Sequence, residues 1–225
     1  MPPLPPARIR IWDLPTRLFH WCLAAGVVAM VLTGRTGGNA MVWHFRCGYG
    51  VLALLLFRLV WGIAGGHWSR FARFLPSPAR AWAYLRGRDA DRPHAGHSPL
   101  GALSVYAMLL VLLVQAGTGL FSDDEIASSG PLSRFLSDTQ VSALSGWHKD
   151  YGQWLVIGLV LLHVLAVLYY TLVRRKALVG AMLHGDGVAA PGTAASRDSA
   201  ASRLAAAVVF AACIALVWWI STLGG

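Results

Sequence analysis

The chain has 225 residues, of which 56% are hydrophobic and only 13% charged, and its mean hydropathy is +0.55. This composition excludes an ordinary water-soluble domain and predicts a membrane protein. The formal charge of +9 would suggest nucleic-acid binding in a soluble protein, but here it has to be explained together with the apolar composition.

Five apolar runs are long enough to cross a bilayer, since a helix needs about 20 residues to span a hydrocarbon core of roughly 30 Å. The runs cover residues 18–34, 44–64, 99–121, 148–173 and 204–223. Arginines precede the first run, as in a signal peptide, but no small-residue cleavage site follows it, so we expect this helix to be retained. The pattern predicts an all-α integral membrane protein.

The segment between the second and third runs is the largest polar piece, and it mixes arginines with aromatic and aliphatic side chains. These are Arg70, Arg73, Arg80, Arg86, Arg88 and Arg92, interleaved with Phe71, Phe74, Trp82, Tyr84 and Leu85. The mixture predicts a short amphipathic helix that lies on the inner membrane surface and contacts anionic lipid headgroups. Nucleic acid is the alternative partner, and the flanking membrane spans argue against it.

Residues 185–202 are rich in Ala, Gly and Ser, which is typical of a flexible linker. We therefore expect a four-helix domain in residues 1–184, this linker, and an additional transmembrane helix in residues 203–225.

The distribution of Lys and Arg predicts the orientation, because positively charged flanks stay on the cytoplasmic side. Three arginines precede the first run, six lie between the second and third, and five basic residues lie between the fourth and fifth. The other two loops have one each, Arg35 and Arg134. The second of these loops also carries four acidic residues, Asp123, Asp124, Glu125 and Asp138. We expect a cytoplasmic N-terminus and, after five spans, a C-terminus on the opposite side.

Ionisable side chains inside membrane spans are costly and mark functional sites. Four histidines lie in the predicted spans, His20, His44, His148 and His163. In the expected topology His44 and His148 both begin descending helices near the outer side. His163 follows His148 by 15 residues, about 22 Å along the helix and on nearly the same face, which brings it to the depth of His20. The four therefore form an outer pair, His44 with His148, and an inner pair, His20 with His163.

Two imidazoles without carboxylates or thiolates are too few for a closed zinc site, which needs four ligands. The three cysteines form no Cys-x-x-Cys motif, which excludes zinc ribbons, a disulfide scaffold and covalently attached haem. Haem needs only axial ligands, and two imidazoles give a low-spin iron suited to electron transfer. The histidine pairs thus predict two haem groups inside a four-helix bundle.

Further residues near the two ligand levels are candidates for haem contacts. Gly48, one turn from His44, would let a flat macrocycle approach the helix, although small residues also simply let helices pack closely. Arg17, Arg46 and Arg58 are candidates for ion pairs with haem propionates. Snorkelling to lipid headgroups is the alternative role for Arg17 and Arg58.

Five motifs resemble those of one known family. They are IWDLPTRLFHW at residues 11–21, LFRLVWG at 56–62, GHSPLGA at 96–102, GTGLF at 117–121 and HVLAVLY at 163–169. Over roughly residues 8–184 the chain resembles the bacterial cytochrome b561 and nickel-iron hydrogenase b-type cytochrome family. The resemblance implies that four helices hold two b-type haems, with His20, His44, His148 and His163 as iron ligands. The fifth span departs from this four-helix pattern.

The resemblance also implies a function, electron exchange between the quinone pool and a redox partner in the bacterial inner membrane. The partner would be a protein such as a hydrogenase or soluble cytochrome, or a small oxidant. The alternative is a b subunit that anchors a larger hydrogenase or dehydrogenase complex. Whether the chain is itself a quinol oxidoreductase, and whether it forms oligomers, the sequence leaves open.

Two functions from other classes compete with electron transfer. A proton-coupled transporter usually has acidic residues inside its spans, and the only acid close to one here is Asp150. A purely structural anchor would not need histidines at matched depths.

Overall fold

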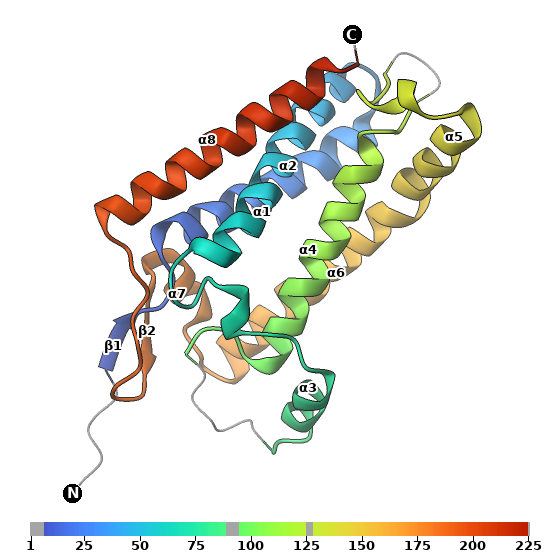
Figure 1. Ribbon diagram of the computed structural model, residues 1–225. Helices are drawn as coiled ribbons and strands as arrows, with labels where there is room; N and C mark the ends of the chain where they lie inside the picture. Colours follow the sequence, from blue (N-terminus) through green and yellow to red (C-terminus); the bar gives the residue numbers. More distant parts are fainter. Residues whose placement is uncertain (1–6, 89–94, 125–127, 225) are drawn as a thin grey trace, which may run out of the picture. The chain divides into compact units, whose positions relative to one another are not determined.

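The computed structural model describes residues 7–88, 95–124 and 128–224. Arg92 and Glu125, which contribute to the predicted charge asymmetry, lie outside the described residues. In the described part of the chain, five helices are long and apolar enough to span a membrane (Figure 1). Their central elements are α1 (Leu14–Thr36), α2 (Met41–Ala64), α4 (Pro99–Gly119), α6 (Gln153–Leu168) and α8 (Ala200–Thr222). The predicted helical membrane fold with five spans is confirmed.

The fourth helical run begins ten residues before the predicted span, at Asp138. It consists of α5 (Asp138–Gly146), the π-helical turn η4 (Trp147–Gly152), α6, and a second π-helical turn η5 (Tyr169–Val173). A capping box starts it, because the Ser137 hydroxyl accepts from the Gln140 amide while the Gln140 side chain accepts from the Ser137 amide. His148 lies in η4, and such π-turns inside helices are frequent at functional sites.

Shorter elements connect the long helices. They are the helices α3 (Pro78–Leu85) and α7 (Leu178–His184), the strands β1 (Ala7–Arg10) and β2 (Asp186–Ala189), and the 3-10 turns η1 (Gly38–Ala40), η2 (Phe71–Arg73) and η3 (Ser133–Phe135). In the predicted amphipathic segment, α3 buries Ala81 and Tyr84 and exposes Trp82 and Leu85. The helix is thus two-sided, as the interleaved pattern predicts.

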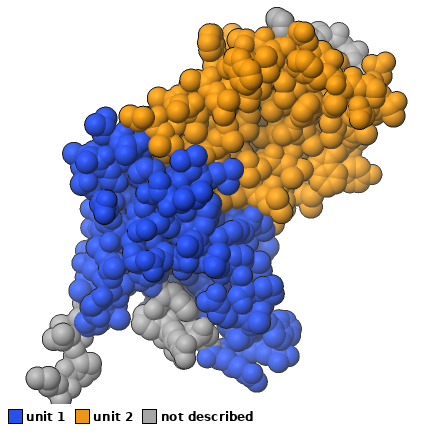
Figure 2. Space-filling model, viewed as in Figure 1, with its two compact units in different colours: residues 1–18, 59–107, 161–207 blue, residues 19–58, 108–160, 208–225 orange. Residues whose placement is uncertain are grey.

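The chain forms two compact units (Figure 2). Each unit takes residues from all five long helices. Unit 1 comprises residues 1–18, 59–107 and 161–207, and unit 2 comprises residues 19–58, 108–160 and 208–225.

In unit 1, β1 and β2 pair antiparallel, with Ala7 opposite Ala189 and Arg10 opposite Asp186. β2 belongs to the segment for which composition predicted a flexible linker. Backbone pairing does not depend on side-chain identity, so a composition rich in Ala, Gly and Ser did not reveal it. Residues 186–189 of this segment thus form a strand in the structure.

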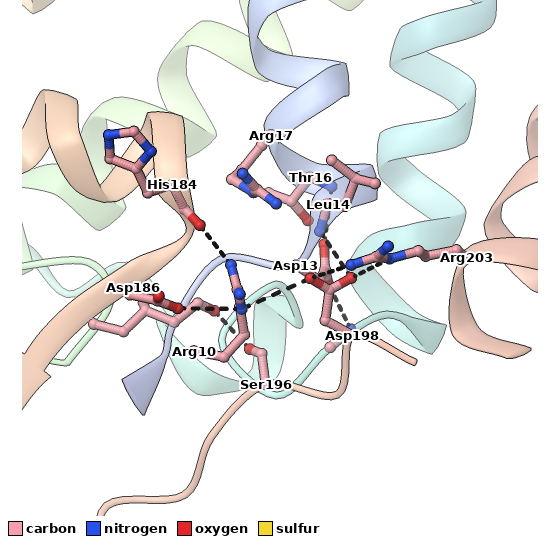
Figure 3. Close-up of polar contacts among 12 residues, drawn as sticks. Arg10, Asp13, Leu14, Thr16, Arg17, His184, Asp186, Ser196, Asp198 and Arg203 are labelled. Carbon is pink, nitrogen blue, oxygen red and sulfur yellow. Dashed lines mark hydrogen bonds and ion pairs between the residues drawn. The ribbon is translucent and has the colours of Figure 1, made fainter. Parts of the chain in front are cut away.

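Polar side chains hold the start of α1 in unit 1 (Figure 3). The carboxylate of Asp13 is fully buried and accepts hydrogen bonds from the amides of Thr16 (2.8 Å) and Gly66 (2.9 Å) and from the Ser69 hydroxyl (2.9 Å). Asp13 therefore caps α1, which is why the helix begins at Leu14, four residues before the predicted span.

Residues of the segment that follows β2 also contact the start of α1. Asp198 accepts from the Leu14 amide at 3.2 Å and pairs with Arg203 at 3.0 Å and Arg10 at 3.7 Å (Figure 3). Burial acts to raise the pKa of Asp198, but the hydrogen bonds from Arg203 and Leu14 and the charges of both arginines lower it overall. The Ser196 hydroxyl also donates to the carbonyl of Ile11 at 2.6 Å.

The core of unit 2 contains Leu52 and Ala53 of α2 and Val217 of α8, all buried. Partly buried side chains pack around them, Tyr49, Leu56, Ala116, Leu120 and Phe210. The ring of Phe210 also meets that of Phe57 edge to face, with centroids 5.8 Å apart. The fifth helix therefore shares a core with α2 and α4.

Candidate functional site

The structure brings His44 and His148 together in unit 2. His44 lies in the first turn of α2 and His148 in the π-helical turn η4. Their ring centroids are 6.2 Å apart and their planes are almost perpendicular, at 89°. Both rings line a cavity of about 400 Å³, a size within the range of small-molecule and cofactor sites.

The two imidazoles are held in the same way. The Nδ1 atom of His44 lies 3.1 Å from the carbonyl oxygen of Met30 in α1, and Nδ1 of His148 lies 2.9 Å from the carbonyl oxygen of Gln115 in α4. A carbonyl oxygen can only accept a hydrogen bond, so Nδ1 carries the ring hydrogen in both residues. The lone pair is then on Nε2, which is the arrangement of a metal-binding histidine with an oriented second nitrogen.

Apolar and small side chains make up most of the cavity wall. They are Val27, Met30, Val31, Gly34, Gly37, Gly38, Met41, Phe45, Gly48, Tyr49, Val51, Leu52, Leu112, Ala116, Gly119, Leu120 and Val156. Gly48 lines the cavity, and a Cβ atom built on it would meet the Met30 methyl carbon at 3.3 Å. The space beside this glycine is taken up by the Met30 side chain.

Polar residues line the cavity where α4 ends and η4 begins. They are Gln115, Ser122, Asp123, Asp124, Ser128, Lys149 and Gln153. The Nζ atom of Lys149 donates to the backbone carbonyl of Asp123 at 2.8 Å. The cavity thus has a mainly apolar wall and a polar edge that carries one cation, Lys149, and two carboxylates, Asp123 and Asp124.

Sequence reasoning missed Lys149 and Gln115. Lys149 directly follows His148 and is among the few charged residues within an apolar run. Its position in the sequence could therefore have identified it as a candidate. Gln115 contributes its backbone carbonyl to His148 and donates its side-chain amide to the backbone of the same residue at 3.0 Å. No sequence signal points to such a backbone contact.

The other two histidines of the predicted set lie in different units. His20 is in the part of α1 that belongs to unit 2, where its ring meets that of Trp21 edge to face at 5.0 Å. His163 is in the part of α6 that belongs to unit 1. Their pairing stays a prediction.

The three predicted arginines have different surroundings. Arg46 is exposed, its guanidinium lies 5.1 Å from the ring centroid of Trp43, and it does not line the cavity. Arg17 donates to the carbonyl of Leu183 at 2.6 Å within unit 1. Arg58, in the α2 segment of unit 2, is buried, with 3% of its surface exposed. A buried guanidinium needs a compensating anion or several acceptors.

Among the residues that the structure describes, no three or more His, Cys, Asp or Glu side chains gather in a way that could hold a metal ion. His44 and His148 form a two-ligand site instead. Such a pair suits a metal whose other ligands come from a cofactor.

The comparisons agree with this chemistry. Residues 11–185 match the profile of the family described as prokaryotic cytochrome b561, and α8 lies outside the matched range. The "Probable Ni/Fe-hydrogenase B-type cytochrome subunit" of Azotobacter chroococcum is 24% identical over 215 residues, which cover 79% of this chain and 87% of the relative. The protein of the same name from Azotobacter vinelandii is also 24% identical, over 211 residues, with the same coverage.

A third relative is the "Probable Ni/Fe-hydrogenase 1 B-type cytochrome subunit" of Escherichia coli. It is 23% identical over 209 residues, which cover 78% of this chain and 88% of the relative. No solved structure matches the chain significantly.

Proposed function

Since the chain belongs to the prokaryotic cytochrome b561 family, we propose that it carries electrons between membrane quinone and a redox partner through two haem b groups. The observation that carries the proposal is the pair His44 and His148, two imidazoles whose ring centroids lie 6.2 Å apart in the wall of one cavity. The family makes the chain a b-type cytochrome of a prokaryotic membrane. The number of haems, their ligands and the quinone are our proposal.

The spacing of the two rings fits haem. An imidazole nitrogen binds a transition metal at about 2 Å, and a five-membered ring with bonds near 1.35 Å has its centre about 1.1 Å behind that nitrogen. Two imidazoles on opposite sides of one iron therefore have centroids about 6 Å apart, close to the observed 6.2 Å. When bound, haem with two axial imidazoles supplies a one-electron carrier without an open coordination position.

The chain's own groups would hold the cofactor in a fixed orientation. The Met30 and Gln115 carbonyls fix the two Nδ1–H groups, so both Nε2 atoms remain available as ligands. Gly48 adds no side chain to the cavity wall, which we propose lets the macrocycle approach α2. We propose that Lys149, at the polar edge, pairs with a haem propionate, a role for which Arg46 is the second candidate.

We propose that a second haem binds His20 and His163. The support is their matched depth in the expected topology, together with two guanidinium groups near that level. Arg58 is buried in α2 and is suited to a propionate, and Arg17 is a further candidate. Two haems roughly 20 Å apart along the membrane normal would carry electrons across the bilayer.

The redox partner we propose is a hydrogenase, because the chain is similar to hydrogenase b-type cytochrome subunits over most of their length. In that case the chain is the b subunit and membrane anchor of a larger complex. A stand-alone cytochrome that exchanges electrons with quinol and another oxidant is the second candidate. Co-purification from native membranes distinguishes the two.

The first test is a count of haem. We expect the purified chain to show the reduced-minus-oxidised spectrum of b-type haem at two haems per chain. His148→Ala and His44→Ala should each remove one haem and leave the other, and His20→Ala and His163→Ala should remove the second. A chain purified from haem-replete cells without b-type haem, or with both haems retained in all four variants, would contradict the proposal.

A further inference from the structure

The same dipeptide, Thr-Gly, lies beside each histidine of the outer pair. Thr33 and Gly34 are near the end of α1 and face His44, and Thr118 and Gly119 end α4 and face His148. The separations along the chain differ, 11 residues in one case and 30 in the other. The two sites therefore share the position of Thr-Gly relative to the histidine in space, and not a spacing along the sequence.

Each threonine adds an acceptor for the histidine. Thr33 Oγ1 lies 3.2 Å from Nδ1 of His44, and Thr118 Oγ1 lies 3.3 Å from Nδ1 of His148. Both hydroxyls donate their hydrogen to a carbonyl of their own helix, Ala29 at 2.7 Å and Gln115 at 3.0 Å. The hydroxyl oxygen is then free to accept from the imidazole.

The acceptors of each site come from one helical turn. For His44 they are the Met30 carbonyl and the Thr33 hydroxyl, and for His148 the Gln115 carbonyl and the Thr118 hydroxyl. In both cases the carbonyl is three residues before the threonine. Two acceptors on one Nδ1–H group restrict the rotation of the ring more than one acceptor does.

Each glycine leaves space for the imidazole itself. A Cβ atom on Gly34 would lie 3.0 Å from Cε1 of His44, and a Cβ atom on Gly119 would lie 2.9 Å from Cε1 of His148. Both distances are shorter than ordinary van der Waals contact, so any larger residue would push the ring away. Gly117, in the same helix, has no atom within 4 Å of its Cβ position.

We propose that Thr33-Gly34 and Thr118-Gly119 are paired positioning residues, which set the rotation of the two axial imidazoles and hold their planes perpendicular. The glycine brings the helix against the ring edge, and the threonine with its carbonyl neighbour fixes the direction of Nδ1–H. The proposal rests on the proposed function, because it assumes that His44 and His148 bind one haem.

Perpendicular axial imidazoles have a spectroscopic signature. A low-spin ferric haem with perpendicular ligand planes gives a strongly anisotropic EPR signal, whereas parallel planes give a rhombic one. The hydrogen bonds to Nδ1 have a second effect, since they make the imidazole a stronger donor and favour the ferric state. Ring orientation and midpoint potential are thus two separate readouts.

The test uses the full-length, haem-loaded protein. Thr33→Val and Thr118→Val remove the hydroxyl with little change in shape, and Thr33→Ser and Thr118→Ser keep it. Thr36→Val is a matched control in α1, because Thr36 is exposed and its hydroxyl donates to Leu32 rather than to a histidine. For the glycine positions, Gly34→Ala and Gly119→Ala are compared with Gly117→Ala.

We expect both valine variants to bind two haems per chain, with a weaker anisotropic EPR signal and a higher midpoint potential of one haem. Serine should restore both readouts, and Thr36→Val should match the parent. Gly34→Ala and Gly119→Ala should change the EPR signal, whereas Gly117→Ala should not. If an alanine variant does not fold, the comparison of the valine with the serine variants at Thr33 and Thr118 still tests the inference.

Valine variants with the parent EPR signal and the parent potential would overturn the inference. So would a shift of equal size in Thr36→Val. Failure of the proposed function is a different result, because it is seen when His44→Ala and His148→Ala keep both haems.

Discussion

At the residue scale, the buried carboxylate of Asp13 stabilises the start of α1 by accepting several hydrogen bonds. It accepts from Thr16, Gly66 and Ser69, and the Trp61 indole nitrogen lies 3.3 Å from one of its oxygens. In Asp13→Asn the side-chain amide would face donors, so at least one buried donor would lose its acceptor, at a cost of about 1–3 kcal/mol. We expect the midpoint of thermal unfolding, followed by circular dichroism, to fall by several degrees.

Asp186→Asn is the matched control for this prediction. Asp186 pairs with Arg10 at 3.2 Å, but its side chain is 38% exposed, and exposed ion pairs contribute little. Equal losses in the two variants would mean that the buried donors around Asp13 are not what stabilises the start of α1.

At the element scale, α8 is the helix whose role the family resemblance does not supply. Its Val217 has 2% of its surface exposed and packs against Leu52 and Ala53 of α2, while Val208 of the same helix is 62% exposed. Val217→Ala should therefore leave an unfilled space that costs about 1–2 kcal/mol, and Val208→Ala should cost almost nothing. Thermal unfolding of the two variants in one detergent measures the difference.

Leu52 belongs both to this core and to the cavity wall. We therefore expect Val217→Ala also to release haem from the outer site at a lower temperature than Val208→Ala does, followed by the Soret absorbance. Identical haem loss in the two variants would show that α8 does not support the cavity.

At the scale of the whole molecule, the charge asymmetry predicts the orientation in the membrane. Alkaline phosphatase is active only after export, so a fusion after residue 225 should be active and a fusion after residue 88 inactive. A fluorescent protein that folds only in the cytoplasm should give the opposite pattern at the same two positions. Activity after residue 88 would contradict the expected topology and, with it, the depths from which the histidines were paired.

The five spans and the outer histidine pair could be predicted because they depend on properties averaged over long segments. Hydropathy over about 20 residues located the helices, and the alternating direction of the spans placed His44 and His148, each at the start of a descending helix, at one depth. The Thr-Gly pairs could not be predicted, because their contacts depend on which helix faces meet and at what distance. The contacts of Asp13 with Gly66 and Ser69 were missed for the same reason, since these donors lie more than fifty residues further along the chain. Its cap on the Thr16 amide is local, and an Asp directly before the helix was an available signal for it.

The pairing of β1 with β2 has a consequence for the order of assembly. β1 is made before α1, and β2 only after α6, so β1 has no partner while the intervening helices are being inserted. Contacts between residues so distant along the chain form late, because the loop between them must be closed first. The β1–β2 pairing can thus form only after the ribosome has translated the fourth span. In a chain that ends before residue 186, β1, which precedes α1, has no strand to pair with.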